Sequence, residues 1–590
     1  MSVKLKHSIY FVLLILFFTI SGCSSVHTSD YSAPDYSNAE IRNMEIKEIT
    51  NSMKDKPVYS LWKAWLLKKT INPNTNVVTN VSNEENEDIQ QLPSETKLFN
   101  DCVDLCVDLY IDAVKNANSV VSARYYSTLN SLAPEALKKI DEKDLKPQNS
   151  NKSVENSFAM VDDSEKTQKV SHFIAGTVTV WVDLGVKVEK GVGYANRVIG
   201  SGFFIRKDGY LITNYHVIAE TVDPKYEGYS RVYIKLSSDT DTRIPARVVG
   251  YDKALDLALL KTEIDAPYVF TLGSSVNLDV GDTIYAIGSP VGLTSTITSG
   301  IVSSFDRQLL SMAAVMQIDA AVNSGNSGGP LINENGEVQG VVFAGIPDYQ
   351  GLNFAIPVEY LKVILPRLYT GDFIPEALEH DDKITTEPHN QRVTTAHEIK
   401  CAWTGSYGIT YKEPGDTTGK GVQLLYIMPG GSSDQAGMTA GDIITKVNGH
   451  EVNSIEELQN ELIKLPPDMV ITYTVNDVNK PIYLDVRPEY PGSKFRERDN
   501  DWNVMYPLFG MHLIPTSSSD HSQFYIDSIA KGSIADESGF SVNDPVSIKS
   551  AKVIPNGSYL LAEIYTKKRK SGYLDVNISI AAPMDSPLFF

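Results

Sequence analysis

The sequence predicts a multidomain chain: an N-terminal α-helical region, then a β-rich domain of the barrel type, then mixed α+β domains. The chain has 590 residues, enough for about four domains of about 150 residues each. Apolar residues recur at helical spacing over residues 46–145, whereas short alternating strands broken by glycines fill residues 170–370. Polar stretches at 146–169 and 371–398 are predicted linkers. The formal net charge of -20 disfavours nucleic acid as a partner.

Residues 1–22 are predicted to be an export signal. Lys4 and Lys6 precede an apolar run from Ile9 to Ile20, which is too short for an unassisted membrane span. The run ends in Gly22-Cys23, and small residues before a cysteine at this place resemble the lipobox of bacterial lipoproteins. The resemblance implies cleavage before Cys23 and a lipid anchor on it; the alternative is an ordinary signal peptide that contains a cysteine. Residues 24–45 are polar and predicted to be a tether.

The helical region carries no recognisable chemical constellation. One apolar stripe recurs at spacings of three and four: Phe99, Cys102, Cys106, Leu109, Ala113 and Ala117. Trp62, Trp65, Leu66 and Leu67 indicate a second buried helix. With no histidine nearby to complete a metal site, Cys102 and Cys106 are interpreted as buried cysteines. We expect a helical domain of unknown role.

The β-rich segment contains a candidate nucleophile in Gly325-Asn326-Ser327-Gly328-Gly329. Glycines around Ser327 permit the tight turn that converges backbone N–H groups on an oxyanion, with Gly325 and Ser327 as expected donors. A serine needs a general base, and only His172 and His216 lie in this segment. His172 sits at its edge, so His216, predicted to end a strand of the hairpin around Lys207-Asp208-Gly209, is the candidate.

The third catalytic candidate is Asp256, which stands directly before the apolar run Leu257 to Leu260. An acid held there can fix the imidazole tautomer. Asp252 is the rival, but it lies further from the apolar run and is expected at the surface. The order His216, Asp256, Ser327 is that of chymotrypsin-like double β-barrels, rather than of subtilisins or α/β-hydrolases.

The segment resembles the HtrA (Deg) family of trypsin-like serine proteases. The resemblance covers roughly residues 170 to 368 and rests on motifs that follow one another in the family's order: Gly200-Ser201-Gly202-Phe203, Thr213-Asn214-Tyr215-His216-Val217, Asp256-Leu257-Ala258-Leu259-Leu260-Lys261, Gly288-Ser289-Pro290-Val291-Gly292-Leu293, Gln317-Ile318-Asp319-Ala320-Ala321-Val322 and Asn353-Phe354-Ala355-Ile356-Pro357. Tyr215 and Ser324 depart from the family's usual Asn and Pro, and neither removes a catalytic group.

Residues 399–490 resemble a PDZ domain, through Ser406-Tyr407-Gly408-Ile409, Ala440-Gly441-Asp442-Ile443-Ile444 and a helix with Ser454 at its N-cap. The resemblance implies that the turn at Tyr407, Gly408 and Ile409 binds a peptide's carboxylate. Residues 500–590 also resemble a PDZ domain, but more weakly. Pro545, which has no backbone N–H, stands where the first domain has a residue that can donate one, so we expect a degenerate second PDZ-like domain.

The resemblance implies an extracytoplasmic endopeptidase that cleaves misfolded or damaged proteins under PDZ control. The alternative is a PDZ-based scaffold lipoprotein whose proteolysis is incidental or lost. Apolar pocket walls at Ala320–Val322 and Val341–Ala344 favour cleavage after small aliphatic residues. The family often forms trimers, which implies a homo-oligomer, although the added helical region departs from the family pattern. The sequence indicates no metal site and no cofactor.

Position 326 bears on activation. In digestive proteases of this fold the residue before the catalytic serine is an aspartate, which pairs with a newly cut α-amino group. Asn326 carries no charge for such a pair. We therefore expect activity without N-terminal clipping, and control by the loops near Thr294–Ile297 and Gln308–Val315.

Overall fold

A computed structural model describes the following residues, and all structural statements below refer to them: 39–70, 94–116, 118–140, 145, 170–189, 191–226, 228–289, 296–310, 312–323, 325–345, 352–371, 396–517, 522–555, 557–569 and 573–590. The predicted signal segment, Cys23 and the predicted linker 146–169 lie outside them. Residues 492–584 form one compact unit, whereas 39–491 and 585–590 belong to another. Within the described ranges, no helix combines the length and apolarity needed to cross a membrane.

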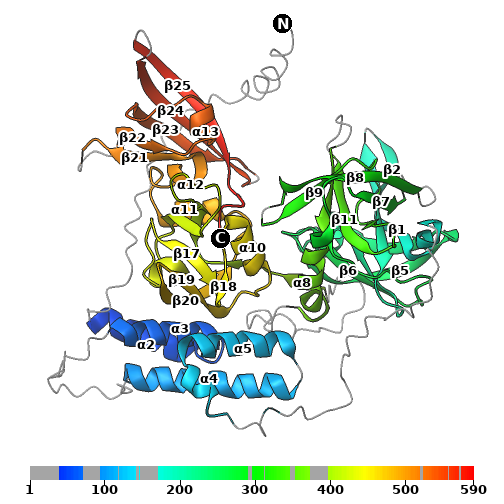
Figure 1. Ribbon diagram of the computed structural model, residues 1–590, viewed down its shortest axis with the longest axis horizontal. Helices are drawn as coiled ribbons and strands as arrows, with labels where there is room; N and C mark the ends of the chain where they lie inside the picture. The colour runs from blue at the N-terminus through cyan, green and yellow to red at the C-terminus, as the bar shows by residue number, and fades with distance from the viewer. Residues whose placement is uncertain are drawn as a thin grey trace. The chain divides into compact units, whose positions relative to one another are not determined.

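The N-terminal region is helical, as predicted (Figure 1). Its helices are α2 (Ala39–Ser52), α3 (Pro57–Thr70), α4 (Glu95–Lys115), α5 (Ser119–Leu132) and α6 (Pro134–Leu137). Helix α2 begins inside the stretch predicted as a tether, so that prediction is wrong for residues 39–45. Ser94 and Asn118 start α4 and α5 by accepting hydrogen bonds from the N–H groups of Lys97 and Val121.

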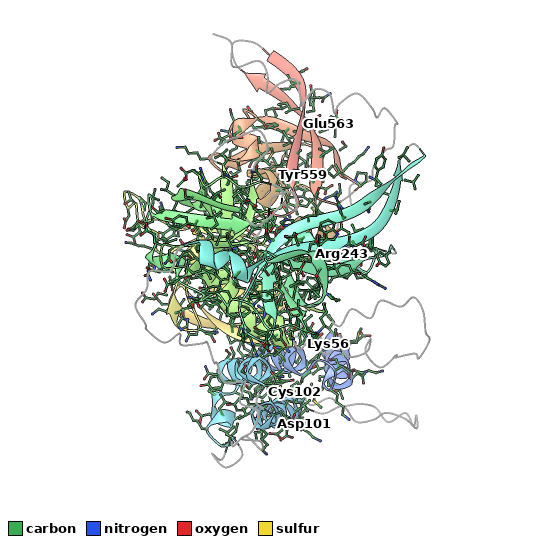
Figure 2. All side chains as sticks on the ribbon, turned by 90° about the vertical axis from the view of Figure 1, so that its right-hand side faces the viewer. Lys56, Asp101, Cys102, Arg243, Tyr559 and Glu563 are labelled. Atoms are coloured by element: carbon green, nitrogen blue, oxygen red, sulfur yellow. The ribbon has the colours of Figure 1, made fainter. Side chains whose placement is uncertain are left out.

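The predicted apolar stripe is the buried face of α4. Phe99, Cys102, Cys106 and Ala113 are buried there, while Leu109 is partly buried and Ala117 lies outside the described residues. Cys102 lies within the helical bundle (Figure 2). Burial raises the pKa of its thiol to about 12 and that of Cys106 further. Both thiols are therefore protonated and unreactive at neutral pH.

The helical region packs on the first PDZ domain through specific polar contacts. Trp62 is fully buried, and its ring stacks on Tyr483 at a centroid distance of 5.4 Å. The hydroxyl of Thr128 accepts the N–H of Val470 at 3.0 Å, and the hydroxyl of Ser127 donates to the carbonyl of Val470 at 2.8 Å. Because these side chains pair with backbone groups of a strand, the helices contribute to the PDZ domain's own hydrogen bonding.

Replacing Thr128 by valine is expected to weaken this interface by about 1–3 kcal/mol, because the buried N–H of Val470 loses its acceptor at nearly constant volume. Thr128→Ser keeps the hydroxyl and is the matched control. Hydrogen exchange at the Val470 amide, followed by mass spectrometry, measures the effect. Faster exchange only in the valine variant is expected; equal exchange in all three proteins contradicts the role of the hydroxyl.

Two β-barrels follow. The first contains β1 (Thr177–Glu189), β2 (Val192–Phe204), β3 (Tyr210–Thr213), β4 (Arg231–Leu236), β5 (Asp239–Asp252) and β6 (Leu257–Thr262), and pairing of β5 with β6 closes it. The second is the closed barrel of β7 (Thr283–Gly288), β8 (Thr296–Gln308), β9 (Ala314–Ile318), β10 (Pro330–Ile332), β11 (Val338–Gly345) and β12 (Asn353–Pro357). Short helices η1 (Val170–Gly176), α7 (Tyr215–Val222) and η2 (Ser275–Asn277) accompany them. The double barrel confirms the predicted fold class.

The predicted hairpin around Gly209 forms between β2 and β3. Phe203 pairs with Ile212 across the turn at Gly209, whose φ of 92° suits glycine.

Helix α8 (Val358–Thr370) ends the protease region, and Arg367 on it donates to the carbonyl of Ile463 at 3.2 Å. The predicted linker 371–398 is wrong at its end, because β13 (His397–Ile399) adds in parallel to β5.

The first PDZ domain is a sheet in the order β14-β20-β19-β17-β16-β15, with β18 paired to β17. Its elements are β14 (Ala402–Trp403), β15 (Ser406–Thr410), β16 (Val422–Ile427), α9 (Ser432–Gln435), β17 (Ile443–Val447), β18 (His450–Glu451), α10 (Ile455–Ile463), β19 (Met469–Val475) and β20 (Val478–Val486). Ser454 caps α10 by accepting the N–H of Glu457, as predicted. Asn448 and Gly449 both have positive φ, which closes the β17–β18 turn.

The unit of residues 492–584 holds the second PDZ domain, a sheet in the order β21-β22-β23-β24-β25. Its elements are α11 (Pro491–Arg498), α12 (Met505–Phe509), β21 (Met511–Pro515), β22 (Phe524–Ile529), α13 (Ile534–Glu537), β23 (Pro545–Val553), β24 (Tyr559–Arg569) and β25 (Tyr573–Pro583). Residues 585–590 do not belong to it, contrary to the predicted span of 500–590, and pack with the first PDZ domain.

Candidate active site

An imidazole–carboxylate pair lies in the first barrel. His216 Nδ1 is 2.7 Å from Asp256 Oδ2, and the backbone N–H of His216 donates to Asp256 Oδ1 at 2.8 Å. The Asp256 side chain is 8% exposed and that of His216 is 46% exposed. The carboxylate is thus shielded and committed to the histidine, while nearly half of the histidine side chain is exposed to solvent.

Two local features hold this pair. His216 lies in the first turn of α7, so the prediction that it ends a strand is wrong. Asp256 has a φ of 53°, a left-handed conformation that asparagine and aspartate tolerate best among residues with side chains. Its carbonyl accepts the side-chain N–H of Asn214 at 2.9 Å and the N–H of Tyr215 at 3.1 Å, which ties the turn to the start of α7. Such strained conformations persist where the surroundings fix them, often at functional sites.

The alternative residues lie elsewhere. Asp252 is buried, at 1% exposure, so the expectation of a surface position is wrong. Its carboxylate accepts the N–H groups of Ala254 and Leu255 and so closes the turn that leads to Asp256. His172 lies in η1. Because Asp252 and Asp256 are both buried, burial does not show which of them is the partner of His216. The hydrogen bonds do: only the carboxylate of Asp256 faces the histidine, among the bonds described here.

Ser327 lies in the turn before β10. Its hydroxyl donates to the carbonyl of Phe343 at 3.1 Å, and the Phe343 ring lies edge-on to His216 at a centroid distance of 6.4 Å. Within the described residues, the N–H groups of Gly325 and Ser327 donate to no protein acceptor. Gly325 has a φ of 104°. Neither expected oxyanion donor is therefore occupied by another described residue.

Ser201 holds the serine turn to the first barrel, a role that the sequence did not indicate. Its N–H donates to the carbonyl of Ser327 at 2.8 Å, and its hydroxyl donates to that of Gly325 at 2.6 Å. The N–H of Ser289 donates to the same hydroxyl at 2.9 Å. These bonds tie the carbonyls of Gly325 and Ser327 to the first barrel and so help to position the turn. The signal in the sequence for this contact is the Gly200-Ser201-Gly202 motif, whose pattern alone does not point to a partner.

Close packing explains the glycine after the serine. Gly328 has a φ of 87°, and a Cβ there would lie 2.3 Å from the carbonyl oxygen of Ser201. No residue with a side chain fits without moving the backbone. Of the predicted pocket walls, Ala320, Val341 and Val342 are buried in the second barrel, and the side chain of Ala344 lies outside the described part.

The predicted carboxylate turn is part of a strand. Tyr407, Gly408 and Ile409 lie in β15, the last strand of the first PDZ sheet, so one edge of β15 is free of that sheet's own strands. Tyr407 is buried and Ile409 is 38% exposed. In the second PDZ domain the matching position is Gly510, which ends α12 with a φ of 79°.

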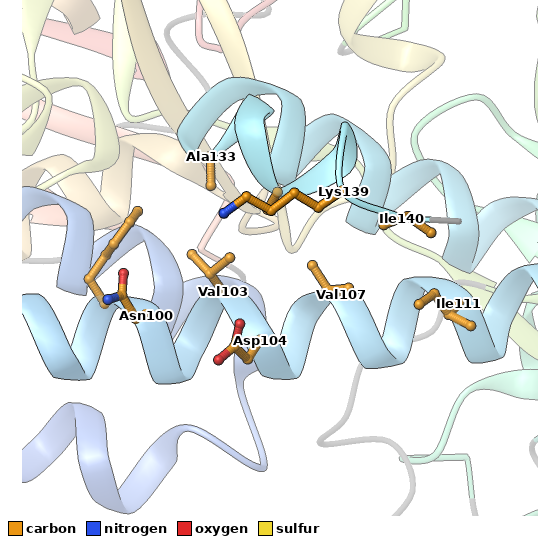
Figure 3. Close-up of a pocket in the computed structure, with 10 residues that line it drawn as sticks. Asn100, Val103, Asp104, Val107, Ile111, Ala133, Lys139 and Ile140 are labelled. Carbon is orange, nitrogen blue, oxygen red and sulfur yellow. The ribbon is translucent and has the colours of Figure 1, made fainter. Parts of the chain in front are cut away.

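The helical region has a groove of about 540 Å³ between α4 and the residues around α6 (Figure 3). Val103, Val107 and Ile111 line its floor, and Lys139 reaches over it. Across the described parts of the chain, no group of His, Cys, Asp and Glu is suited to hold a metal ion.

Family models match four parts of the chain. A trypsin-like peptidase domain matches residues 200–341, a PDZ domain matches 424–475, and the TP0546 family PDZ domain matches 492–584. A domain of unknown function, DUF8517, matches residues 40–148.

Curated relatives cover the protease and PDZ parts. The putative serine protease HhoB of Synechocystis is 32% identical over 49% of this chain and 66% of its own length. The probable periplasmic serine endoprotease DegP-like of Chlamydia trachomatis is 29% identical over 49% of this chain and 53% of its own. The matched stretch thus spans half to two thirds of these relatives. Among solved structures, the HtrA-type protease AlgW with tripeptide aligns with a TM-score of 0.42 and 25% identity, over 54% of this chain and 96% of its own.

A double barrel with a trypsin-like peptidase match, followed by two PDZ domains, is the architecture of PDZ-bearing serine proteases of the trypsin class. The chain belongs to the HtrA family.

Proposed function

We propose that this chain is an extracytoplasmic serine endopeptidase that degrades misfolded or damaged proteins, with Ser327 as nucleophile, His216 as general base and Asp256 as orienting acid. The observation that carries the proposal is the shielded Asp256 carboxylate, which accepts both the ring and the backbone N–H of His216. It sits in the barrel that also anchors the serine turn through Ser201. The relatives' names as serine proteases support the same activity.

The chemistry follows from the two halves of the site. Asp256 holds the proton on Nδ1, so Nε2 of His216 is free to accept the proton of the Ser327 hydroxyl as that oxygen attacks the scissile carbonyl. The N–H groups of Gly325 and Ser327 stabilise the resulting oxyanion. His216 then gives the proton to the leaving amine. Because the hydroxyl donates to Phe343 here, that hydrogen bond has to break before the proton can pass to His216.

We expect the chain to be active without N-terminal cleavage. Asn326 is buried, and its side-chain oxygen has no hydrogen-bond partner among the described residues. An amide there cannot neutralise a buried ammonium group. Chain expressed from residue 24 onward should cleave casein while mass spectrometry shows it intact. An intact chain that gains activity only after cleavage ahead of residue 170 contradicts this expectation.

Lipid on Cys23 would place the enzyme on the outer side of a bacterial membrane, in line with relatives named periplasmic. Acyl chains at about 0.8 kcal/mol per buried CH₂ make such an anchor stable. Cys23→Ser is expected to move the protein from the membrane fraction to the soluble fraction, whereas the same change at Cys401 should leave it in place. Mass spectrometry of the mature N-terminus is the second measurement, and an unmodified N-terminus at another residue contradicts the anchor.

Chain ends of unfolded proteins are the partners proposed for the first PDZ domain, and the family's trimers support a homo-oligomer. The alternative function, a PDZ-based scaffold lipoprotein, is distinguished from the protease by whether casein cleavage requires the hydroxyl of Ser327.

A further inference from the structure

The free edge of β15 carries a short strand from a distant part of the chain. The N–H of Ser406 donates to the carbonyl oxygen of Phe590 at 2.8 Å, and the N–H of Phe590 donates back to Ser406 at 2.9 Å. The N–H of Gly408 donates to Leu588 at 3.2 Å, and Tyr407 forms an antiparallel bridge with Phe589. Residues 588–590, called here the edge segment, therefore extend the first PDZ sheet in the way an added peptide would.

The side chains of the edge segment alternate as in any strand. Phe590 is fully buried in the same core as Leu458 and Leu462 of α10, and Leu588 packs against that core. Phe589 points the other way, and its ring lies 5.7 Å from that of Tyr407. The site thus accepts an extended segment with large apolar side chains at alternate positions and an aromatic ring between them.

Polar groups on the PDZ side hold the backbone of this segment. The hydroxyl of Thr404 donates to the Phe590 oxygen at 3.0 Å. Arg487 donates to the Asp585 carboxylate at 2.7 Å and to the Ser586 carbonyl at 3.2 Å, which fixes the approach of the segment. Of the predicted carboxylate-binding residues, Gly408 donates a backbone hydrogen bond to the segment. Ser406 and Thr404, which also bind it, were not predicted. A Cβ at Gly408 would lie 2.7 Å from the carbonyl oxygen of Gln423 on β16 and 3.2 Å from the Phe590 ring, so glycine fits both neighbours of β15.

The edge segment is an addition to the first PDZ sheet rather than one of its strands. The sheet from β14 to β15 is continuous without it. The segment follows a separate compact unit, residues 492–584. We propose that the edge segment is an exchangeable intramolecular ligand of the first PDZ domain, and that an external peptide with the same Leu-Phe-Phe pattern binds only by displacing it. This deepens the proposed function by naming what occupies the recognition site.

The consequence for binding is quantitative. A ligand tethered to its own site competes at a high effective concentration. If the open state is about 1% of the population, an external peptide binds about 100-fold more weakly than it would to an empty site. Substrate chain ends would then engage the domain only when they are locally abundant or match the aromatic pattern closely.

The test measures binding in the full chain carrying Ser327→Ala, so its result does not depend on whether the chain cleaves peptide bonds. The probe is a fluorescently labelled peptide of residues 583–590, and fluorescence anisotropy compares the chain with and without residues 588–590. We expect the deletion to tighten binding by at least about tenfold. A peptide with Phe590→Asp should bind neither protein.

Deleting residues 588–590 could unfold the domain, so a second, milder variant is measured beside the deletion. Asp585→Asn weakens the contact to Arg487 but keeps the Phe590 pocket filled, so it should bind the probe with an affinity between the other two. The deletion variant should also regain thermal stability when the peptide is added. Equal affinity in all three proteins, no binding by the deletion variant, or its unfolding without rescue by peptide would each overturn the proposal and make the segment a fixed part of the domain.

Discussion

Ser327→Ala is expected to reduce the rate of casein cleavage by at least about 10⁴-fold, because the hydroxyl is the only group proposed to attack the substrate. His216→Ala should lose about as much, and the double variant little more, since members of a triad act as a unit. Stability should hardly change. The hydroxyl makes one bond, to the Phe343 carbonyl in a half-buried position, and losing it costs about 1 kcal/mol.

A matched control is available in the same barrel pair. The hydroxyl of Ser237 also donates to one backbone carbonyl, that of Ile174, at 3.2 Å. Ser237→Ala therefore removes a bond of the same kind away from the site, and it should cleave casein at the wild-type rate. Thermal unfolding confirms that the variants are folded. Undiminished cleavage by Ser327→Ala would exclude Ser327 as the nucleophile and favour the scaffold alternative.

Asp256→Asn is expected to lower kcat/KM by about 10⁴-fold while leaving the backbone in place. Asparagine tolerates the left-handed φ of 53° at this position. The two N–H groups of His216 bind different oxygens of the Asp256 carboxylate, and asparagine keeps only one of those oxygens. If that oxygen stays on the backbone N–H, the amide NH₂ faces Nδ1. The ring then carries its proton on Nε2 and cannot accept the proton of Ser327.

Asp252→Asn is the control, because its carboxylate caps backbone N–H groups rather than the histidine. A carboxamide oxygen can accept those two bonds, so kcat/KM should stay close to the wild-type value. The measurement is turnover of a fluorogenic peptide derived from casein. A loss at Asp252 equal to that at Asp256 would show that the turn, rather than the charge facing His216, matters.

Features encoded by near neighbours in the sequence were predicted well. The apolar stripe of α4, the N-cap at Ser454, the hairpin around Gly209 and the glycines of the Ser327 turn each depend on residues within a few positions. Spacing and turn chemistry report such features directly. The sequence therefore determined the order of domains, the two barrels and the candidate triad residues by number.

Features that depend on distant hydrogen bonds could not be predicted in this way. Asp252 and Asp256 are both buried acids in one turn, and only the packed structure shows which carboxylate faces His216. His216 starts a helix rather than ending a strand because Asp256 binds its backbone N–H from 40 residues away. The strand pairing of β13 with β5 likewise joins segments that no local pattern relates.

The sequence by itself thus determined the family, the architecture and the residues of the proposed triad. Only the tertiary structure decided that Ser201 fixes the oxyanion turn, that the helical region shares hydrogen bonds with the first PDZ domain, and that residues 588–590 occupy its edge. The physical reason is common to all three. A backbone N–H or C=O is present at every position, so the sequence does not mark which of them a distant group will bind; the packing of the folded chain does.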